Sequence, residues 1–203
     1  MARLLRPAMQ GDLDGLCGVY SIVNAVQWAL HTGNAAAWAS KHAPKRLSWA
    51  EREALFDTLV TPLGKRRPLA KFVTGGISAL ELTRLLRISR EWVFAHRSAE
   101  LVSRRPFYGQ REVAKRRVIR LLTQHLAMPG SAAIVGIEWT LPHWTVATGL
   151  SRKRIRLFDS GYGVFLTLKG VSFRGAGRAN GVKPGDIFLL RLSPKPSARA
   201  QRP

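Results

Sequence analysis

The sequence predicts an α+β fold, with helices in its first part and antiparallel strands in its second part. In the first part, apolar residues recur at spacings of three and four, as on the buried face of a helix. After residue 130, short β-branched and aromatic runs are separated by glycine, proline or basic turns. The 203 residues, 46% of them hydrophobic, are enough for one domain with a proper core. We expect that domain over residues 1–192, with a helical half over about 1–130, a sheet half over about 131–192 and a disordered basic tail over 193–203.

Capping signals set the starts of the first three predicted helices. The first helix is expected over about 17–31, between a cap candidate, Asp14 or Gly15, and a Gly-Asn pair beyond its end. A serine and a glutamate with capping-box spacing predict a second helix over about 48–60, which a Thr-Pro-Leu-Gly run would stop. The same spacing recurs further along and predicts a third helix over about 78–87.

The remaining elements follow from the period of the apolar residues. The short aromatic run 91–95 predicts a strand. The clearest amphipathic pattern covers 110–128 and predicts a helix that a Pro-Gly pair ends. Five further strands are expected one after another, over about 132–139, 144–150, 154–159, 164–168 and 186–192.

Cysteine occurs once, as Cys17, and this limits both the redox chemistry and the metal binding of the chain. A lone cysteine forms no internal disulfide and no cysteine-rich zinc site, and the five histidines lack a local ligand spacing. We therefore expect no metal and no cofactor. The basic N-terminal segment precedes no apolar signal region, and no apolar run is long enough for a membrane span. The expected location is the cytoplasm, or delivery without a cleaved signal peptide, as for a secreted effector.

Basic residues greatly outnumber acidic ones, with 33 Lys and Arg against 12 Asp and Glu and a formal net charge of +21. Such a field favours acidic partners, including nucleic acid, membrane surfaces and acidic protein faces. The densest basic runs lie over residues 104–120 and 152–156. They predict either the steering of an acidic substrate or simply solvated faces, and no recognised nucleic-acid-binding motif accompanies them.

Three residues have the pattern of a cysteine hydrolase. Cys17 starts the first predicted helix, where the helix N-terminus favours a thiolate. His143 starts one predicted strand and Asp159 ends the next, so a single hairpin would bring these two side chains together. A carboxylate beside a histidine fixes its tautomer, and a histidine beside a cysteine takes its proton. Each residue alone has an ordinary structural explanation, but their order and placement together predict a catalytic triad.

The residues around this triad resemble a known family. The carriers of the resemblance are Gln10, the Cys-Gly pair at 17–18, the His-Trp-Thr-Val run at 143–146 and the Phe-Asp-Ser run at 158–160. Together they are similar to the papain-like cysteine peptidase superfamily. Within it they most resemble the bacterial peptidases that trim double-glycine leader peptides, and the stand-alone relatives of those peptidases.

The resemblance implies a papain-like fold and a role for each matching residue. Cys17 would be the nucleophile, His143 the general base and then the general acid, and Asp159 the group that orients the imidazole. Gln10 would stabilise the oxyanion together with the backbone N–H of Cys17. The match covers three patches, and residues from about 35 to 125 resemble no family. The Asp-Gly-Leu-Cys run that ends at Cys17 is also similar to the ovarian-tumour-type deubiquitinases of the same superfamily.

Four neighbours of the triad are candidates for a substrate cleft. Trp139 and Trp144 flank the histidine, although both are also explained as core residues, and Gly15 and Gly18 would let a substrate backbone approach the nucleophile. The expected partner is a protein or peptide substrate, acidic or ubiquitin-like. Two alternatives stay open. An acyltransferase of the transglutaminase type would use the same triad, and a basic nucleic-acid-binding protein would leave Cys17 as an inert core residue.

Overall fold

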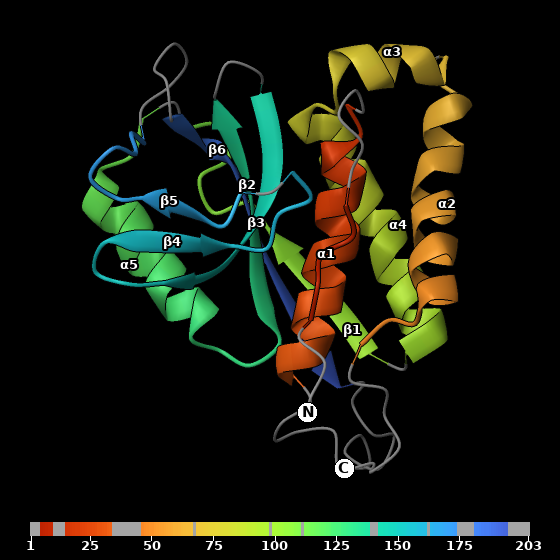
Figure 1. The fold of residues 1–203 in the computed structure, drawn as a ribbon, viewed down its shortest axis with the longest axis horizontal. Helices are drawn as coiled ribbons and strands as arrows, with labels where there is room; N and C mark the ends of the chain where they lie inside the picture. Colours follow the sequence, from red (N-terminus) through yellow and green to blue (C-terminus); the bar gives the residue numbers. More distant parts are fainter. Residues whose placement is uncertain are drawn as a thin grey trace, which may run out of the picture.

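The computed structural model describes residues 5–9, 15–33, 46–66, 68–97, 99–110, 112–138, 142–161, 163–173 and 181–194. This part of the chain forms five α-helices and one sheet of six strands whose named strands pair antiparallel, which confirms the α+β class. In Figure 1, α1, α2 and α4 lie on one side of the sheet and α5 lies on the other. No helix within these described ranges is long and apolar enough to span a membrane.

The helices of the described residues are α1 (Cys17–Gly33), α2 (Trp49–Gly64), α3 (Leu69–Gly75), α4 (Ala79–Arg97) and α5 (Lys115–Leu126). The predicted start of α2 is correct, because Ser48 and Glu51 exchange both hydrogen bonds of a capping box. Its predicted end at residue 60 is wrong, and the helix runs through Pro62 to Gly64. A proline removes one helical hydrogen bond, but the complete burial of Leu63 holds the last turn in place.

Residues 91–95 form helix rather than the predicted strand, because α4 continues from its capping box to Arg97. Trp92 and Val93 extend the buried stripe that begins at Leu82, with the spacing of three and four that one helix face requires. Packing therefore overrides the strand preference of an aromatic run. The predicted helix over 110–128 is shorter than expected, and α3 was not predicted at all.

The strands of the described residues are β1 (Ala99–Arg104), β2 (Ser131–Glu138), β3 (Pro142–Leu150), β4 (Arg154–Leu157), β5 (Phe165–Thr167) and β6 (Gly181–Pro194). Their order in the sheet is β1-β6-β2-β3-β4-β5. β1 belongs to the predicted helical half yet pairs along β6, so the two halves are not separate in sequence. β6 itself includes Ser193 and Pro194, so the tail predicted from residue 193 begins no earlier than 195.

The central strands are buried on both faces. Trp144 and Val146 of β3 pack toward α1, with exposed fractions of 7% and 0%, so Trp144 is a core residue. The opposite face is also covered, because Ala147 packs in a second apolar cluster that includes Val118 and Leu122 of α5. A helix on each side of β3 fixes the strand, and with it the residue at its start, His143.

Candidate active site

Cys17 is the first residue of α1, as predicted, and it is buried against the start of β3. The residue is 5% exposed, and its Sγ accepts a hydrogen bond from the backbone N–H of Trp144 at 3.5 Å. The N-terminus of the helix places its partial positive charge beside the sulfur. The sulfur also lies 3.9 Å from the Gly15 carbonyl oxygen.

Gly15 and Gly18 let the start of α1 approach α3 and the segment that follows it. The backbone N–H of Gly15 donates to the Val73 carbonyl at 2.8 Å, and a Cβ on Gly15 would lie 2.3 Å from that oxygen. A Cβ on Gly18 would meet the Ile77 side chain at 3.1 Å. The packing of the protein's own chain thus explains both glycines, and the approach of a substrate backbone beside them stays a prediction.

His143 and Asp159 lie side by side, as the hairpin argument requires. The Nε2 of His143 lies 2.7 Å from Oδ1 of Asp159, which leaves Nδ1 for the thiol of Cys17. Strand pairing explains the contact, because Phe158 donates its backbone N–H to the Val146 carbonyl at 2.8 Å and continues the β3–β4 ladder. The three residues of the predicted triad therefore come together in the structure.

Other groups besides His143 also hold the Asp159 carboxylate. Its Oδ2 accepts hydrogen bonds from the backbone N–H groups of Gly161 and Gly163, both at 3.0 Å. Its side chain is 2% exposed. Burial alone would raise the pKa of this carboxyl, but the hydrogen bond from His143 and the other donors lower it below its usual value. The carboxylate is therefore ionised and fixed in orientation.

The pKa of His143 is raised to about 9. Burial would lower it, but the hydrogen bond to Asp159, the neighbouring Cys17 thiol and the charges of both residues outweigh that effect. The imidazole is consequently protonated at neutral pH. A histidine between a carboxylate and a thiol is the arrangement in which cysteine nucleophiles are activated.

Thr145 is a further neighbour of the triad that was not predicted as a site residue. It shares a strand face with His143, lies beside Asp159 and helps to lower the pKa of that carboxyl. Its hydroxyl is buried, and its Oγ1 makes no hydrogen bond of good geometry with any described residue. The two-residue alternation along β3 is the sequence signal that points to it.

Trp144 connects the two layers of the site. Its backbone N–H donates to Cys17, and its indole Nε1–H donates to the Ile77 carbonyl at 2.6 Å. Its ring meets Phe188 edge-on, with the ring centroids 5.8 Å apart. Trp144 also lines a cleft beside His143, and the contact of its ring with a substrate stays a prediction.

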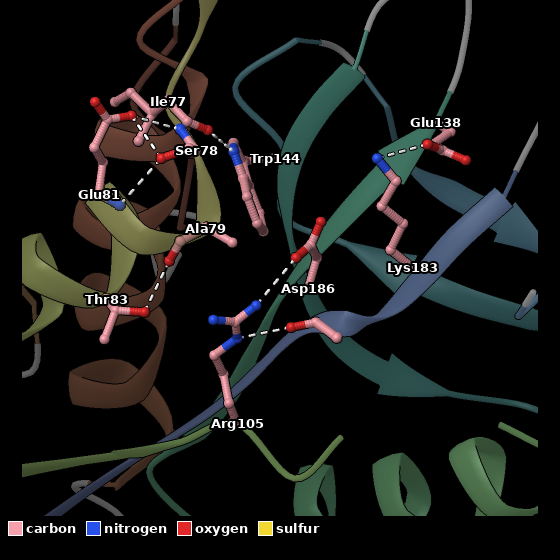
Figure 2. A network of polar contacts seen from close by, with 11 residues as sticks. Ile77, Ser78, Ala79, Glu81, Thr83, Arg105, Glu138, Trp144, Lys183 and Asp186 are labelled. Carbon is pink, nitrogen blue, oxygen red and sulfur yellow. Dashed lines mark hydrogen bonds and ion pairs between the residues drawn. The ribbon is translucent and has the colours of Figure 1, made fainter. Parts of the chain in front are cut away.

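This cleft has a volume of about 280 Å³ and is bounded by both layers of the molecule (Figure 2). Ile77, Ser78 and Ala79 form the wall on the helical side. Three charged residues on the sheet side were not predicted as site residues. Glu138 comes from β2, whereas Lys183 and Asp186 come from β6, so they are far apart in the sequence.

Apart from Arg105, which pairs with Asp186 of this cleft, the basic runs lie away from the triad. Most residues of the first run belong to α5 and its approach, on the opposite side of the sheet from α1 (Figure 1). The second run occupies the β3–β4 turn and β4. This turn is at the end of the hairpin that lies farther from Asp159. Steering of an acidic substrate by these runs would therefore act over a distance.

Two predicted site residues, Gln10 and Trp139, lie outside the described residues. Within the part of the chain that the structure describes, no three His, Cys, Asp or Glu side chains are grouped so as to hold a metal ion. The chain matches no protein-family model, and no curated protein is significantly similar to it.

Proposed function

We propose that this chain is a papain-like cysteine peptidase that hydrolyses a peptide or isopeptide bond. The observation that carries the proposal is the position of His143, which has the Asp159 carboxylate on one side and the Cys17 thiol on the other. An inert core cysteine needs neither partner. The burial of Asp159, the three residues that lower its pKa and the helix N-terminus at Cys17 all support a working ion pair.

The chemistry follows from this arrangement. The Cys17 thiolate attacks the carbonyl carbon and forms a C–S bond, while the carbonyl π electrons move to oxygen. The Cys17 backbone N–H, and Gln10 by the family resemblance, stabilise that oxyanion. His143 then gives its proton to the leaving amine as the C–N bond breaks. Water, deprotonated by His143, attacks the acyl-enzyme and releases the acid and the thiolate.

The architecture also supports a papain-like fold. The nucleophile starts a helix of one layer. The histidine belongs to β3 of the other layer, and the aspartate follows the adjoining strand β4. Substrate would then bind across the junction of the layers, where the cleft beside His143 opens.

The first experiment tests the nucleophile without a known substrate. A small neutral electrophile such as iodoacetamide should alkylate Cys17 rapidly at pH 6, and His143→Ala should slow alkylation about tenfold or more. A peptide library should then be cleaved by the wild type, and Cys17→Ala should lose about 10⁴-fold or more of that activity. Equal alkylation rates in the wild type and His143→Ala would contradict the proposal.

The same preparation separates hydrolysis from acyl transfer. With an added primary amine, a hydrolase yields mainly the free carboxylic acid, whereas an acyltransferase yields the amide of the added amine. Mass spectrometry of the products distinguishes the two. Thermal unfolding of each variant checks that a loss of activity is not a loss of fold.

A further inference from the structure

The cleft beside His143 lies at a bulge of β6 that brings charged side chains to the site. Val135 of β2 pairs with Ile187, and Ile137 pairs with Val182, so the four residues 183–186 stand opposite Gly136 alone. Bulges redirect side chains and recur beside active sites. Here the bulge directs Lys183 and Asp186 into the cleft.

Because Gly136 has no side chain, Asp186 and Trp144 can lie directly against its backbone. A Cβ on Gly136 would lie 3.0 Å from the Cβ of Asp186 and 3.2 Å from Cζ3 of Trp144. The cleft therefore has an apolar part, formed by Trp144 and Ile77, next to a carboxylate. An apolar stem with a charged end, as in lysine or arginine, matches such a lining.

Asp186 is held from behind. Arg105 donates to Oδ1 of Asp186 at 3.3 Å and to the Gly185 carbonyl at 2.7 Å, and its guanidinium stacks 4.8 Å from the ring of Phe188. Figure 2 shows Arg105 below the carboxylate and Trp144 above it. Arg105 lies behind the carboxylate and outside the cleft lining, and its charge offsets part of the negative charge of Asp186.

The cleft lacks the excess positive charge of the whole chain. Two carboxylates, Glu138 and Asp186, line it with Lys183 and the protonated His143, so its lining has no net charge, although basic residues outnumber acidic ones 33 to 12 overall. Lys183 is already paired with Glu138 at 2.6 Å. Burial and the nearby Glu138 raise the pKa of Asp186 despite Arg105. Further positive charge at this carboxylate would therefore be stabilising.

We propose that this cleft binds a basic side chain, lysine or arginine, on the leaving-group side of the scissile bond. The assignment of the side rests on the proposed function, because His143 protonates the leaving amine and the cleft begins at His143. The Asp186 carboxylate accepts hydrogen bonds from the ammonium or guanidinium group, and the Trp144 ring covers its stem. The site thus selects a positive residue, in contrast to the acidic substrate that the net charge alone suggests.

The test measures binding without turnover. Cys17→Ala protein is titrated at low ionic strength with the N-acetyl methylamides of lysine, norleucine and glutamate, and the His143 Cε1–H and Trp144 indole signals are followed by NMR. The lysine derivative should bind about fivefold or more tightly than the norleucine derivative, as one ion pair predicts. The glutamate derivative should bind more weakly than both.

Two variants and one control locate the effect. Asp186→Asn should remove most of the preference for lysine, and Glu138→Gln should reduce it. Asp57→Asn makes the same change on the exposed face of α2, outside the cleft, and should leave it unchanged. Equal binding of lysine and norleucine, no saturable shift with any of the three, or a preference that survives Asp186→Asn would overturn the assignment. Failure of the peptidase proposal has a separate signature, which is the alkylation result above.

Discussion

His143 unites the two chemical requirements of the proposed reaction in one side chain. It must be protonated to stabilise a thiolate and to donate to a leaving amine, and it must keep one orientation through both steps. The 2.7 Å contact with Asp159 meets both needs, since it fixes Nε2 and contributes to the raised pKa of about 9. The two glycine N–H groups on the other carboxylate oxygen keep Asp159 from rotating away.

The raised pKa of His143 predicts the alkaline limit of activity. As pH rises through about 9, the imidazole loses the proton that the leaving amine needs, so turnover should fall. Asp159→Asn should move this limit to lower pH and reduce turnover at pH 7 by about tenfold or more. The NMR titration of the His143 Cε1–H signal measures the same pKa directly. A midpoint near the ordinary histidine value in the wild type would contradict this account.

The same shift affects stability with a definite sign. The pKa of His143 is higher in the folded protein than in the unfolded chain, so protonation stabilises the fold. This contribution is complete below the unfolded value and is lost as pH rises through about 9. His125 behaves oppositely. Burial lowers the pKa of His125, although its hydrogen bonds with the Ala132 and Leu190 carbonyls act in the opposite direction. The neutral imidazole therefore stabilises the fold, and this stabilisation is lost as pH falls.

At the scale of elements, one glutamate connects two helices. Oε2 of Glu51 accepts the Ser48 backbone N–H at 2.8 Å in the capping box of α2, and Nη2 of Arg97 at 2.6 Å. Arg97 is at the last position of α4, and its side chain is 4% exposed. Glu51 therefore neutralises a buried charge while it caps a helix.

Replacing Glu51 by glutamine should separate these two roles. The amide oxygen still accepts the capping hydrogen bond, but Arg97 loses its counter-charge, and we expect a loss of about 1–2 kcal/mol in the free energy of unfolding. Glu81→Gln, in the equivalent capping box before α4, is the control and should lower the free energy of unfolding by only about 0.3 kcal/mol. Urea unfolding at pH 7 measures both.

The pH dependence of this difference provides a second check. The lowered pKa of Glu51 means that its stabilisation is present above the unfolded value and is lost as pH falls. The wild type and Glu51→Gln should therefore converge in stability toward pH 3. A difference that persisted undiminished in acid would show that the ion pair is not its source.

Local signals in the sequence predicted what depends on local structure. The capping boxes of α2 and α4 and the helix start at Cys17 were correct because neighbouring residues determine them. The meeting of Cys17, His143 and Asp159 could be predicted because Cys17 starts α1, His143 lies near the start of β3 and Asp159 closely follows β4. Residues 91–95 were wrongly assigned because the burial of Trp92 against other elements decides their structure. The cleft was missed because its charged residues meet only through the β2–β6 pairing and its bulge.

At the scale of the whole molecule, the exposed positive charge of α5 is spatially separate from the site. The exposed arginines of α5 lie across the sheet from α1, whereas the cleft beside His143 holds two of the twelve acidic residues. Exposed charges act within a Debye length of about 10 Å at 0.1 M salt. The basic field should therefore attract polyanions to the α5 side without changing the chemistry at Cys17.

Double-stranded DNA serves as the polyanion that tests this separation. Its affinity should fall steeply as salt is raised, because each phosphate contact releases a counterion, and the doubly substituted Arg116→Ala/Arg120→Ala protein should reduce the log–log salt slope by about 2. Cys17→Ala should bind DNA as the wild type does. Saturating DNA should leave the rate of Cys17 alkylation by iodoacetamide unchanged, since that neutral reagent needs no guidance by charge. Protection of Cys17 by bound DNA would instead place the polyanion across the site, and the basic surface would then belong to substrate recognition.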